Sequence, residues 1–396
     1  MAANPASPEI RQPLRGVRVL EFGHVAAGPF ASSLLADLGA DVVKVEPPGG
    51  DQMRAWPPLA RDDDDTFSHN FAAVNRNKRS VAADLRVPEE ATRVRSLCAA
   101  ADVIVENYRP GVLDRLGFGF DEVSDGHRGM VYCSISGFGR ASAHASAGAY
   151  DVVIQAMSGL MSVTGEPGRP PVKSGVPVAD FVTGLYAAFT AAALLPQVRR
   201  TGSSVHVDCS MLDCMLGVSA LQTSAYWGSG QDEGPLGSAH PRNAPYQAFS
   251  GSDRPFVLAA GNQRLWRSTC EVAGTEHLLD DPRFADQVSR VAHQGELAEL
   301  LQGSFGRKPA AHWVTELRRR GVPVSLVNRF SEILSDEHVA ESGLVSEVPV
   351  PIAGPTSMLN FPVRIAGAPG TVVRRPPLLG EHTDEVLADW TAPHDR

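Results

Sequence analysis

The chain has 396 residues, and at about 150 residues per domain this length predicts two to three domains. Hydrophobic residues make up 43% and charged residues 20% of the chain, so a large core can form without disulfide or metal staples. The 36 basic and 45 acidic residues give a net charge of −9, which argues against a general nucleic-acid binder.

The five cysteines form an odd set without a CxxC pair, which argues against a disulfide framework and against a zinc site. We therefore expect a reducing, cytoplasmic compartment. The opening segment MAANPASPEIRQPLRG lacks the apolar core of a secretory signal. The longest nearly apolar stretch, 174–198, contains two prolines and two glycines, which favours a buried helix over a membrane span.

The first third of the chain alternates strand and helix patterns. Periodic segments predict helices at 28–40 and 88–100, and apolar runs predict strands at 16–23, 41–48, 80–85, 102–108 and 130–139. This alternation indicates parallel βαβ units in a doubly wound α/β sheet. Ligands bind such sheets beyond the carboxyl ends of the strands. Polar residues fall at those ends, although polar loops are also expected there without any function: His24, Glu46, Asn107 and Arg109.

The middle and the end of the chain predict a second, smaller α/β unit. Apolar helices are expected at 150–164 and 179–198, a strand at 204–210 and a further helix to about 227. After a linker at 228–245, strands and helices alternate again, and a helix near 380–390 closes the chain. The acidic run Asp62–Asp65 predicts a solvated loop and not a metal site, because loops that bind hard cations space their ligands apart.

Familiar cofactor and catalytic motifs are absent from the sequence. No GxGxxG follows the first strand, and no GxxxxGK[ST], GxSxG or HExxH occurs. Dehydrogenases, P-loop NTPases, α/β-hydrolases and zincins are therefore not leading candidates.

Asp180 is the one charged residue within 174–198. An unpaired buried carboxylate is costly, so its presence needs a reason. One reason is structural, since an aspartate at a helix start accepts backbone N–H bonds and meets the positive end of the helix dipole. The other is chemical, since a partly dehydrated carboxylate is a better nucleophile than a solvated one. The two interpretations are compatible.

A set of ordered motifs along the chain resembles the class III CoA-transferase family, also called the formyl-CoA or carnitine-CoA transferase type. The motifs are HVAAGP (24–29), LGADVVKVEPPGGD (38–51), NRNKRS (75–80), VENYRPGVLDRLG (105–117), SISGFG (134–139), the block from 150 to 188, and PLLGEHTDEVL (377–387). The resemblance implies an α/β fold with a large Rossmann-like domain made from both chain ends and a smaller domain between them. We place the large domain at 1–225 and 331–396, the small domain at 226–330, and expect an interlocked homodimer.

The same resemblance implies a mechanism in which Asp180 attacks an acyl-CoA thioester. A mixed anhydride and an aspartyl-CoA thioester then follow in turn. The expected partners are an acyl-CoA and a small carboxylic acid, with no nucleic acid and no membrane. No metal and no permanently bound cofactor are expected, because one thioester is exchanged for another.

The resemblance also implies which residues hold CoA. Cationic side chains offset phosphate charge and donate hydrogen bonds to phosphates. The predicted CoA-binding residues are His24, Asn77, Lys78, Arg79, Asn107 and Arg109. Two of these have structural alternatives, since Arg79 could form a surface ion pair and His24 could be a structural histidine.

Three departures from the family pattern argue against two of the activities found in the family. Ala26 stands where oxalate-linked members carry a glutamine, and the small domain has no long glycine-rich loop, so formyl-CoA:oxalate transfer is not expected. Racemases of the family place a histidine before an aspartate where this chain has Tyr150 and Asp151. A phenol is a poor base near neutral pH, which argues against a racemase.

Three functions therefore remain in order of preference. They are a CoA-transferase acting on a small acid such as a dicarboxylate, a 2-methylacyl-CoA racemase, and a non-catalytic CoA-binding protein. Asp151 is expected to orient the pocket. Candidate contacts for a second carboxylate of the acceptor are Arg169, Lys173 and Arg242.

Overall fold

The structure is a computed structural model that describes residues 8–62 and 65–392. It divides into two compact units, one formed by 1–160, 174–228 and 337–396 and the other by 161–173 and 229–336. The segment 161–173, which the predicted division placed within 1–225, groups with the second unit, where Gly237 N donates to Gly165 O. Asp63 and Asp64 of the predicted acidic loop lie outside the described residues, and the flanking Asp62 and Asp65 are exposed.

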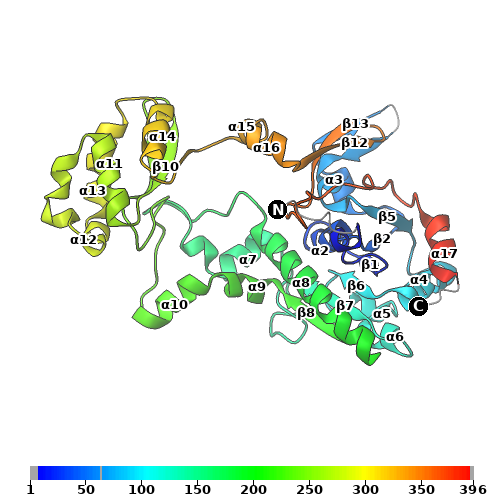
Figure 1. Ribbon diagram of the computed structural model, residues 1–396. Coiled ribbons are helices and arrows are strands. Elements are labelled where there is room, and N and C mark those ends of the chain that lie inside the picture. Colours follow the sequence, from blue (N-terminus) through cyan, green and yellow to red (C-terminus); the bar gives the residue numbers. More distant parts are fainter. Residues whose placement is uncertain (1–7, 63–64, 393–396) are drawn as a thin grey trace. The chain divides into compact units, whose positions relative to one another are not determined.

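A six-stranded parallel sheet forms the centre of the first unit (Figure 1). From edge to edge its strands are β5 (Lys78–Ala82), β2 (Asp41–Glu46), β1 (Arg18–Phe22), β6 (Val103–Glu106), β7 (Val131–Ser136) and β8 (Val205–Ser210). Counted along the chain, the order is 3-2-1-4-5-6, the order of a doubly wound Rossmann-type sheet. The predicted α/β fold with a parallel sheet is confirmed, and the order in which the chain adds strands to the sheet reverses between β1 and β6.

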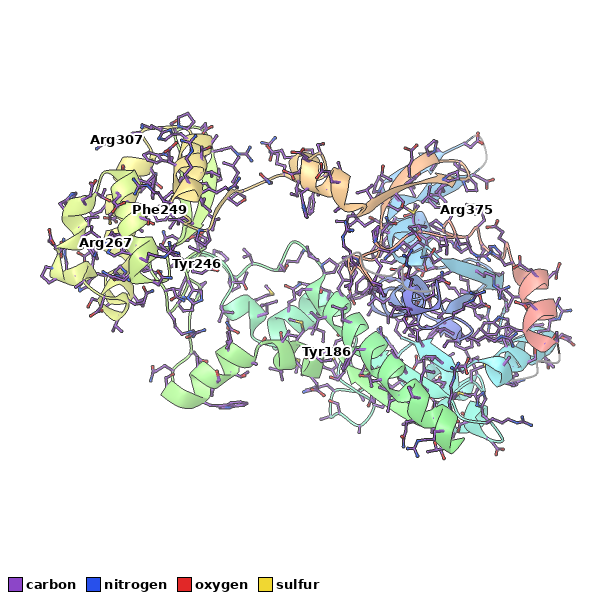
Figure 2. All side chains as sticks on the ribbon, in the orientation of Figure 1. Tyr186, Tyr246, Phe249, Arg267, Arg307 and Arg375 are labelled. Carbon is purple, nitrogen blue, oxygen red and sulfur yellow. The ribbon has the colours of Figure 1, made fainter. Side chains whose placement is uncertain are left out.

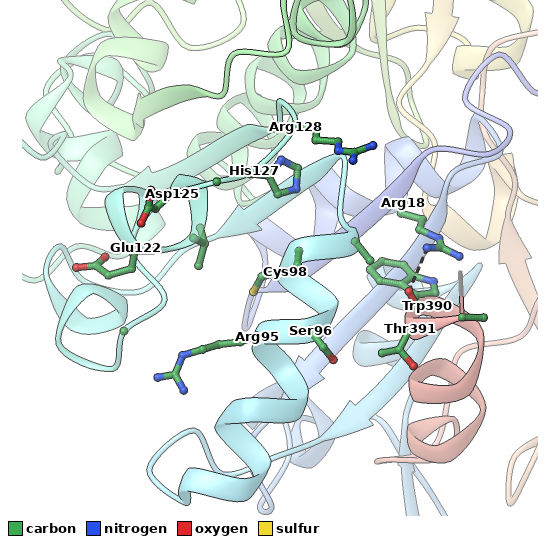
Figure 3. A pocket seen from close by; sticks show the side chains of 16 residues that line it. Arg18, Arg95, Ser96, Cys98, Glu122, Asp125, His127, Arg128, Trp390 and Thr391 are labelled. Carbon is green, nitrogen blue, oxygen red and sulfur yellow. Dashed lines mark hydrogen bonds between the residues drawn. The ribbon is translucent and has the colours of Figure 1, made fainter. Parts of the chain in front are cut away.

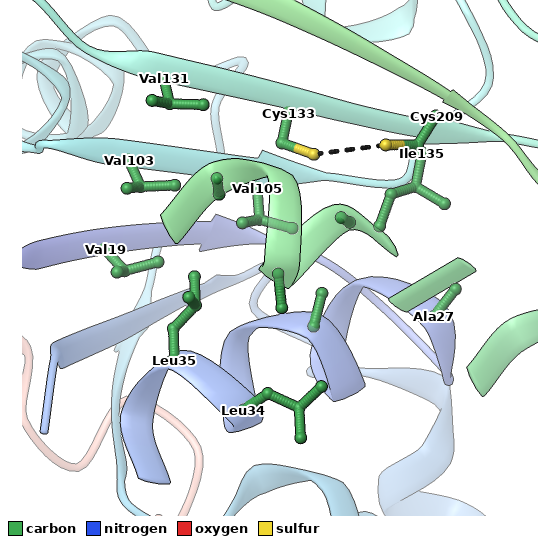
Figure 4. Packing of buried hydrophobic residues seen from close by; sticks show 14 of the residues in the cluster. Val19, Ala27, Leu34, Leu35, Val103, Val105, Val131, Cys133, Ile135 and Cys209 are labelled. Atoms are coloured by element: carbon green, nitrogen blue, oxygen red, sulfur yellow. Dashed lines mark hydrogen bonds between the residues drawn. The ribbon is translucent and has the colours of Figure 1, made fainter. Parts of the chain in front are cut away.

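Helices cover both faces of this sheet. On one face lie α2 (Ala27–Asp37), α8 (Val178–Thr201) and α9 (Met211–Val218), packed on the valines of the central strands (Figure 4). On the other lie α4 (Pro88–Ala100) and α17 (Thr383–Thr391), whose Val386 and Trp390 are buried. Both faces of the sheet are therefore buried under helices, as the nearly uninterrupted apolar residues of its strands predict.

Helix α8 packs closely on α2 at a glycine. A Cβ added to Gly184 would lie 2.9 Å from Ala27 O and 2.9 Å from a ring carbon of Phe30. Helix α8 is long and apolar enough to cross a membrane by length and composition alone, and a core helix of a folded unit passes the same test. Its contact with α2 places the start of α8 beside the loop that follows β1.

Helix α7 is shorter than predicted. It covers Asp151–Met157 and not 150–164, because Gly159 adopts a φ of +83° and a short 3-10 turn follows at Leu160–Ser162. The other elements of the first unit are α1 (Pro8–Arg11), η1 (Gln52–Ala55), β3 (Leu59–Arg61), β4 (Thr66–Ser68), α3 (His69–Asn75), α5 (Val112–Arg115), α6 (Phe120–Ser124), α10 (Ala220–Ser229), α16 (Glu337–Ser342), β12 (Val345–Val350) and β13 (Gly354–Leu359).

The second unit has its own sheet and core. Strands β9 (Tyr246–Ser250), β10 (Pro255–Ala259) and β11 (Val324–Leu326) pair antiparallel with β10 in the middle. The buried Phe249, marked in Figure 2, belongs to the core of this unit. The helices are α11 (Gln263–Ala273), η3 (Glu276–Leu279), η4 (Pro282–Phe284), α12 (Gln287–Ala292), α13 (Gln294–Phe305), α14 (Ala310–Arg319) and α15 (Phe330–Ile333).

Candidate active site

A pocket of about 180 Å³ lies beyond the carboxyl ends of the central strands, at the point between β1 and β6 where the strand order reverses. Loops after β1, β6 and β7 line it, together with the starts of α7 and α8. This is the position at which open α/β sheets bind their ligands. Among the predicted site residues, the structure brings four to this pocket: His24, Asn107, Arg109 and Asp180.

Asp180 is the third residue of α8 and lines the pocket. It lies one helical turn before Gly184, on the face that packs against α2. No residue in the described part of the chain hydrogen-bonds to this carboxylate, so it does not act as the helix cap. Burial, reinforced by the nearby charge of Asp151, raises the pKa of Asp180 to about 7.

Asp151 provides the cap that Asp180 does not. Its Oδ1 accepts from the backbone N–H of Ala179 at 2.8 Å, and its Oδ2 accepts from the amide of Gln155 at 2.5 Å. The buried Gln155 in turn accepts from Ser174 N at 2.8 Å. Asp151 therefore fixes the first turn of α8 from the side while its charge acts on the neighbouring Asp180.

The loop after β1 is held in a strained conformation. Val25 has a φ of +63°, a left-handed conformation that β-branched residues rarely adopt. Both carboxylate oxygens of Asp51 accept from Val25 N, at 3.1 and 3.2 Å. The amide of Asn107 donates to His24 O and accepts from His24 N, each at 2.9 Å. The hydrogen bonds from Asp51 and Asn107 fix the backbone of this loop in its strained conformation. They thereby hold His24 and Val25 at the wall of the pocket.

A fully buried ion network lies beneath this loop. Glu21 contacts Lys44 and Lys78 at 2.8 Å each, and Lys44 also contacts Asp51 at 2.9 Å. Burial alone would raise the pKa of Glu21, but the two ammonium groups outweigh it and hold that pKa below its usual value. The cost of burying these charges is offset only while each of them has a partner of opposite sign. Removing any one of the four side chains would therefore leave a buried charge without another to balance it.

The structure gives Lys78 a different setting from the one expected for a phosphate ligand. Its ammonium donates to Glu21, to Pro29 O and to Asn75 Oδ1, at 2.8, 2.8 and 3.0 Å. These three partners use all three N–H donors. Lys78 therefore supports the start of α2 from inside the core, and no donor remains for CoA.

Arg79 and Asn77 also lie outside the pocket. The Arg79 guanidinium forms ion pairs with Asp41, Glu385 and Asp389, which joins β5 to the C-terminal helix. Asn77 donates to Asp37 and accepts from the backbone of residues 373–374. Both side chains thus fasten the returning tail to the sheet, in line with the ion-pair alternative for Arg79.

Two groups that line the pocket differ in charge. Burial lowers the pKa of His24, so its imidazole is neutral at pH 7. Arg109 follows β6 and is exposed, with its guanidinium over Gly148, where an added Cβ would meet Nη2 at 3.1 Å. No ion pair or side-chain hydrogen bond joins Arg109 to any described residue.

A second pocket of about 170 Å³ adjoins the first, since Tyr108 lines both. Its other walls come from the ends of β2 and β5 and include Pro47, Leu85 and Arg86. A larger cavity of about 1030 Å³ near α4 and α17 contains none of the predicted site residues (Figure 3). Within residues 8–62 and 65–392, no group of three or more His, Cys, Asp or Glu side chains is arranged to hold a metal ion.

Three side chains that support the pocket loop from below, Glu21, Lys44 and Asp51, are not among the residues predicted from the sequence. Charged residues inside predicted strands were a signal, because a lysine in a strand buried on both faces needs an ion-pair partner. The candidates for a second carboxylate, Arg169, Lys173 and Arg242, belong to the second unit, and Arg242 pairs there with Glu233.

Comparison with known proteins identifies the class. The family model described as CoA-transferase family III matches residues 14–383. The chain is 36% identical over 386 residues to the succinate–glutarate CoA-transferase of Agrobacterium fabrum, with 96% of each chain covered. It is 35% identical to the acetyl-CoA:oxalate CoA-transferase of Acetobacter aceti, covering 92% of this chain and 91% of that one. A crystal structure of a CaiB/BaiF family protein from Brucella suis matches with a TM-score of 0.87 and 37% identity, covering 96% and 100%.

The chain therefore belongs to CoA-transferase family III, which confirms the resemblance seen in its sequence. More particularly, it is an enzyme, a CoA-transferase, and coenzyme A is carried by its substrates.

Proposed function

We propose that this enzyme moves CoA from an acyl-CoA to a small dicarboxylic acid through covalent intermediates on Asp180. The observation that carries the proposal is Asp180, which lines the pocket where the strand order reverses and whose carboxylate has no hydrogen-bond partner among the described residues. The relatives named for succinate, glutarate and oxalate support a dicarboxylate as the acid.

The proposed reaction balances without water, ATP or a metal. An Asp180 oxygen attacks the thioester carbonyl, the C–S bond breaks, and CoA leaves as a thiolate. The thiolate attacks the Asp180 carbonyl of the mixed anhydride, which releases the donor acid and forms an aspartyl-CoA thioester. The acceptor carboxylate displaces CoA to form a second anhydride, and the thiolate then attacks its acyl carbonyl. Asp180 is thereby restored.

The surrounding residues prepare this chemistry. Asp151 and Gln155 hold the first turn of α8, so that Asp180 keeps one position through four steps. His24 and Asn107 lie on the same pocket and are proposed to contact CoA, as the resemblance implies. Since Tyr108 separates the two adjoining pockets, the nucleotide of CoA is proposed to lie beyond it, towards Arg86.

A racemase remains the second candidate, and the pocket does not favour it. Tyr150 occupies the position of the racemase histidine and is 74% exposed. No hydrogen bond in the described residues orients this phenol as a base. Both oxygens of the other pocket carboxylate, Asp151, accept hydrogen bonds from Ala179 N and Gln155, so no pair of groups like the racemase histidine and aspartate is arranged here.

Assembly and location belong to the proposal as well. The first unit exposes large apolar side chains along α8, α9 and α10, among them Phe189 at 72% and Trp227 at 79% (Tyr186 of this face is marked in Figure 2). Such a face is typical of a protein interface, which supports the homodimer, and its interlocked form is kept as part of the proposal. All five cysteines are free, which supports a reducing, cytoplasmic location.

We predict that Phe189→Glu together with Trp227→Ser lowers the mass of the particle in solution from two chains to one. A charge placed in an apolar interface is left unpaired and desolvated when two copies meet. Light scattering during size-exclusion chromatography measures the mass. A single-chain mass for the unaltered protein would contradict the homodimer.

The covalent step is tested by trapping. Enzyme mixed with an acyl-CoA and quenched with hydroxylamine is expected to carry a hydroxamate on the peptide that contains Asp180. Peptide mass spectrometry reads the position. Asp180→Asn should show no adduct and lose at least about 1,000-fold in transfer rate, because the other carboxylate of the pocket, Asp151, is occupied by its hydrogen bonds to Ala179 N and Gln155. An adduct on another residue, or transfer by Asp180→Asn at a normal rate, would contradict the proposal.

A further inference from the structure

A buried carboxyl group at the end of β6 has no part in the proposed reaction. Glu106 is 3% exposed, and no ion pair joins it to any residue in the described ranges 8–62 and 65–392. The cation whose charge acts on it, Arg140, is paired with Asp114 at 2.7 Å. Because burying a carboxyl group without a cation is costly, its presence needs another reason.

The loop after β6 supplies that reason, since Glu106 accepts a hydrogen bond from it. The Oε2 atom of Glu106 accepts from Tyr108 N at 2.8 Å. The Tyr108 ring lines both adjoining pockets and packs edge-on against the ring of His24, with the two centroids 4.9 Å apart. Asn107 and Arg109, two of the expected CoA-binding residues, flank Tyr108 in the chain. The bond at Tyr108 N therefore fixes the backbone from which both side chains extend.

Two further strands hold the carboxyl group itself. Glu106 on β6 lies opposite Ser134 on β7, and the hydroxyl of Ser134 hydrogen-bonds to it. His206 on β8 contacts Ser134 Oγ through Nε2 at 2.9 Å. The imidazole of His206 stacks on the ring of Phe120, with centroids 5.1 Å apart and planes at 12°. A row of three polar side chains thus crosses three neighbouring strands, and an aromatic ring fixes its far end.

This row can hold the loop whether or not Glu106 is ionised. Burial raises the pKa of Glu106 to about 7, and burial lowers the pKa of His206, so its imidazole is neutral at pH 7. When Glu106 is ionised, it accepts from Ser134, and the serine accepts from His206. When Glu106 is protonated, it donates to Ser134, and the serine donates to His206. In both forms Oε2 accepts from Tyr108 N.

We propose that Glu106 is a positioning residue, which holds the loop after β6 through Tyr108 N in the conformation that binds acyl-CoA. This inference rests on the proposed function, in which that loop contacts CoA. The role requires an acceptor for Tyr108 N and requires no charge. Loss of the acceptor should therefore weaken the binding of CoA and leave the nucleophile Asp180 intact.

Glu106→Leu and Glu106→Gln separate the hydrogen bond from the charge. Leucine removes the acceptor, so the Kd for CoA and the KM for succinyl-CoA should each rise about 10-fold, while kcat at saturating succinyl-CoA and glutarate stays within about threefold. Glutamine can accept from Tyr108 N and donate to Ser134, so both constants should stay within about twofold of those of the unaltered enzyme. Titration calorimetry with CoA and steady-state kinetics measure these values.

Two further variants complete the test. Asp102→Leu is the matched control, because Asp102 precedes β6 at its other end and likewise accepts a backbone N–H, from Arg18 at 2.9 Å. It should lower the melting temperature and leave the Kd for CoA unchanged. Ser134→Ala keeps the acceptor and removes its support, so the Kd should rise about threefold. This variant tests the row independently of whether Glu106→Leu folds, which thermal melts check.

Several results would overturn the inference. They are a normal Kd for CoA in folded Glu106→Leu or in Ser134→Ala, and a rise in Glu106→Gln or Asp102→Leu as large as that in Glu106→Leu. Failure of succinyl-CoA to label Asp180 in the unaltered enzyme would instead remove the proposed function. The two failures are distinguishable, because calorimetry with CoA measures binding without the covalent step.

Discussion

At the scale of single residues, the chemistry of the site depends on the protonation of one carboxyl group. Only the ionised form of Asp180 can attack a thioester, and burial together with the charge of Asp151 raises its pKa to about 7. We therefore expect kcat/KM for an acyl-CoA to fall as the pH is lowered through about 7 and to level off above it.

Asp151→Asn tests the source of that shift. The asparagine can still accept from Ala179 N but carries no charge, so the pKa of Asp180 should fall and the acid limb of the pH profile should move to lower pH. Gln155→Met is the matched variant, since it removes hydrogen bonds at the same place without changing charge. A limb that moves equally in both variants, or in neither, would show that Asp151 does not act through its charge.

The same scale explains which site residues could be predicted from the sequence. Asp180 stands out because it is the one charge in a long apolar stretch, a pattern that is local in the sequence. The sequence does not reveal that Lys78, an expected CoA-binding residue, pairs with Glu21 in the core. Glu21 lies 57 residues earlier in the chain, and the two side chains meet only once β1 and β5 join one sheet. Asp151 and Ala179 are likewise 28 residues apart. Long-range partners decide whether a charged side chain faces a ligand or the core.

At the scale of elements, the contact between α2 and α8 positions the nucleophile. Gly184→Ala would place a Cβ 2.9 Å from Ala27 O, and such overpacking costs about 1–3 kcal/mol, more than the helix gains in propensity. Denaturant unfolding should show a loss of stability, and kcat should fall because α8 shifts against the pocket loop. Gly303→Ala in α13 meets nothing within 4 Å and should be neutral or stabilising. Equal effects of both variants would contradict close packing at Gly184.

Most elements of the sheet could be predicted because their patterns are regular. The helix at 88–100 matches α4 at both ends, where Pro88 starts it and the chain turns to extended conformation at Ala101. Helix α7 was predicted too long, since apolar periodicity continues past the turn at Gly159. The β3–β4 and β12–β13 pairs are harder to predict from the sequence. Each is a two-stranded sheet that contributes little area to a core, so its strands carry no long apolar run.

At the scale of the whole molecule, the chain ends meet in one sheet unit. Helix α17 packs on α4 and β5, and Arg79 joins β5 to it through Glu385 and Asp389. The returning tail thus completes the core behind the strands that carry the pocket. The resemblance to a known family, and not periodicity, allowed this return to be expected, since no local pattern records which distant segments pack together.

The transfer of oxygen during turnover tests the central claim most directly. In the proposed sequence the donor acid leaves with an oxygen from Asp180, and the acceptor then supplies an oxygen that restores the carboxylate. With acceptor carboxylate labelled with ¹⁸O, Asp180 should gain one heavy oxygen in the first turnover, and donor acid released in later turnovers should carry it. Mass spectrometry of the Asp180 peptide and of the released acid measures both. Donor acid that already carries the label in the first turnover, with no heavy oxygen in Asp180, would contradict covalent catalysis by Asp180.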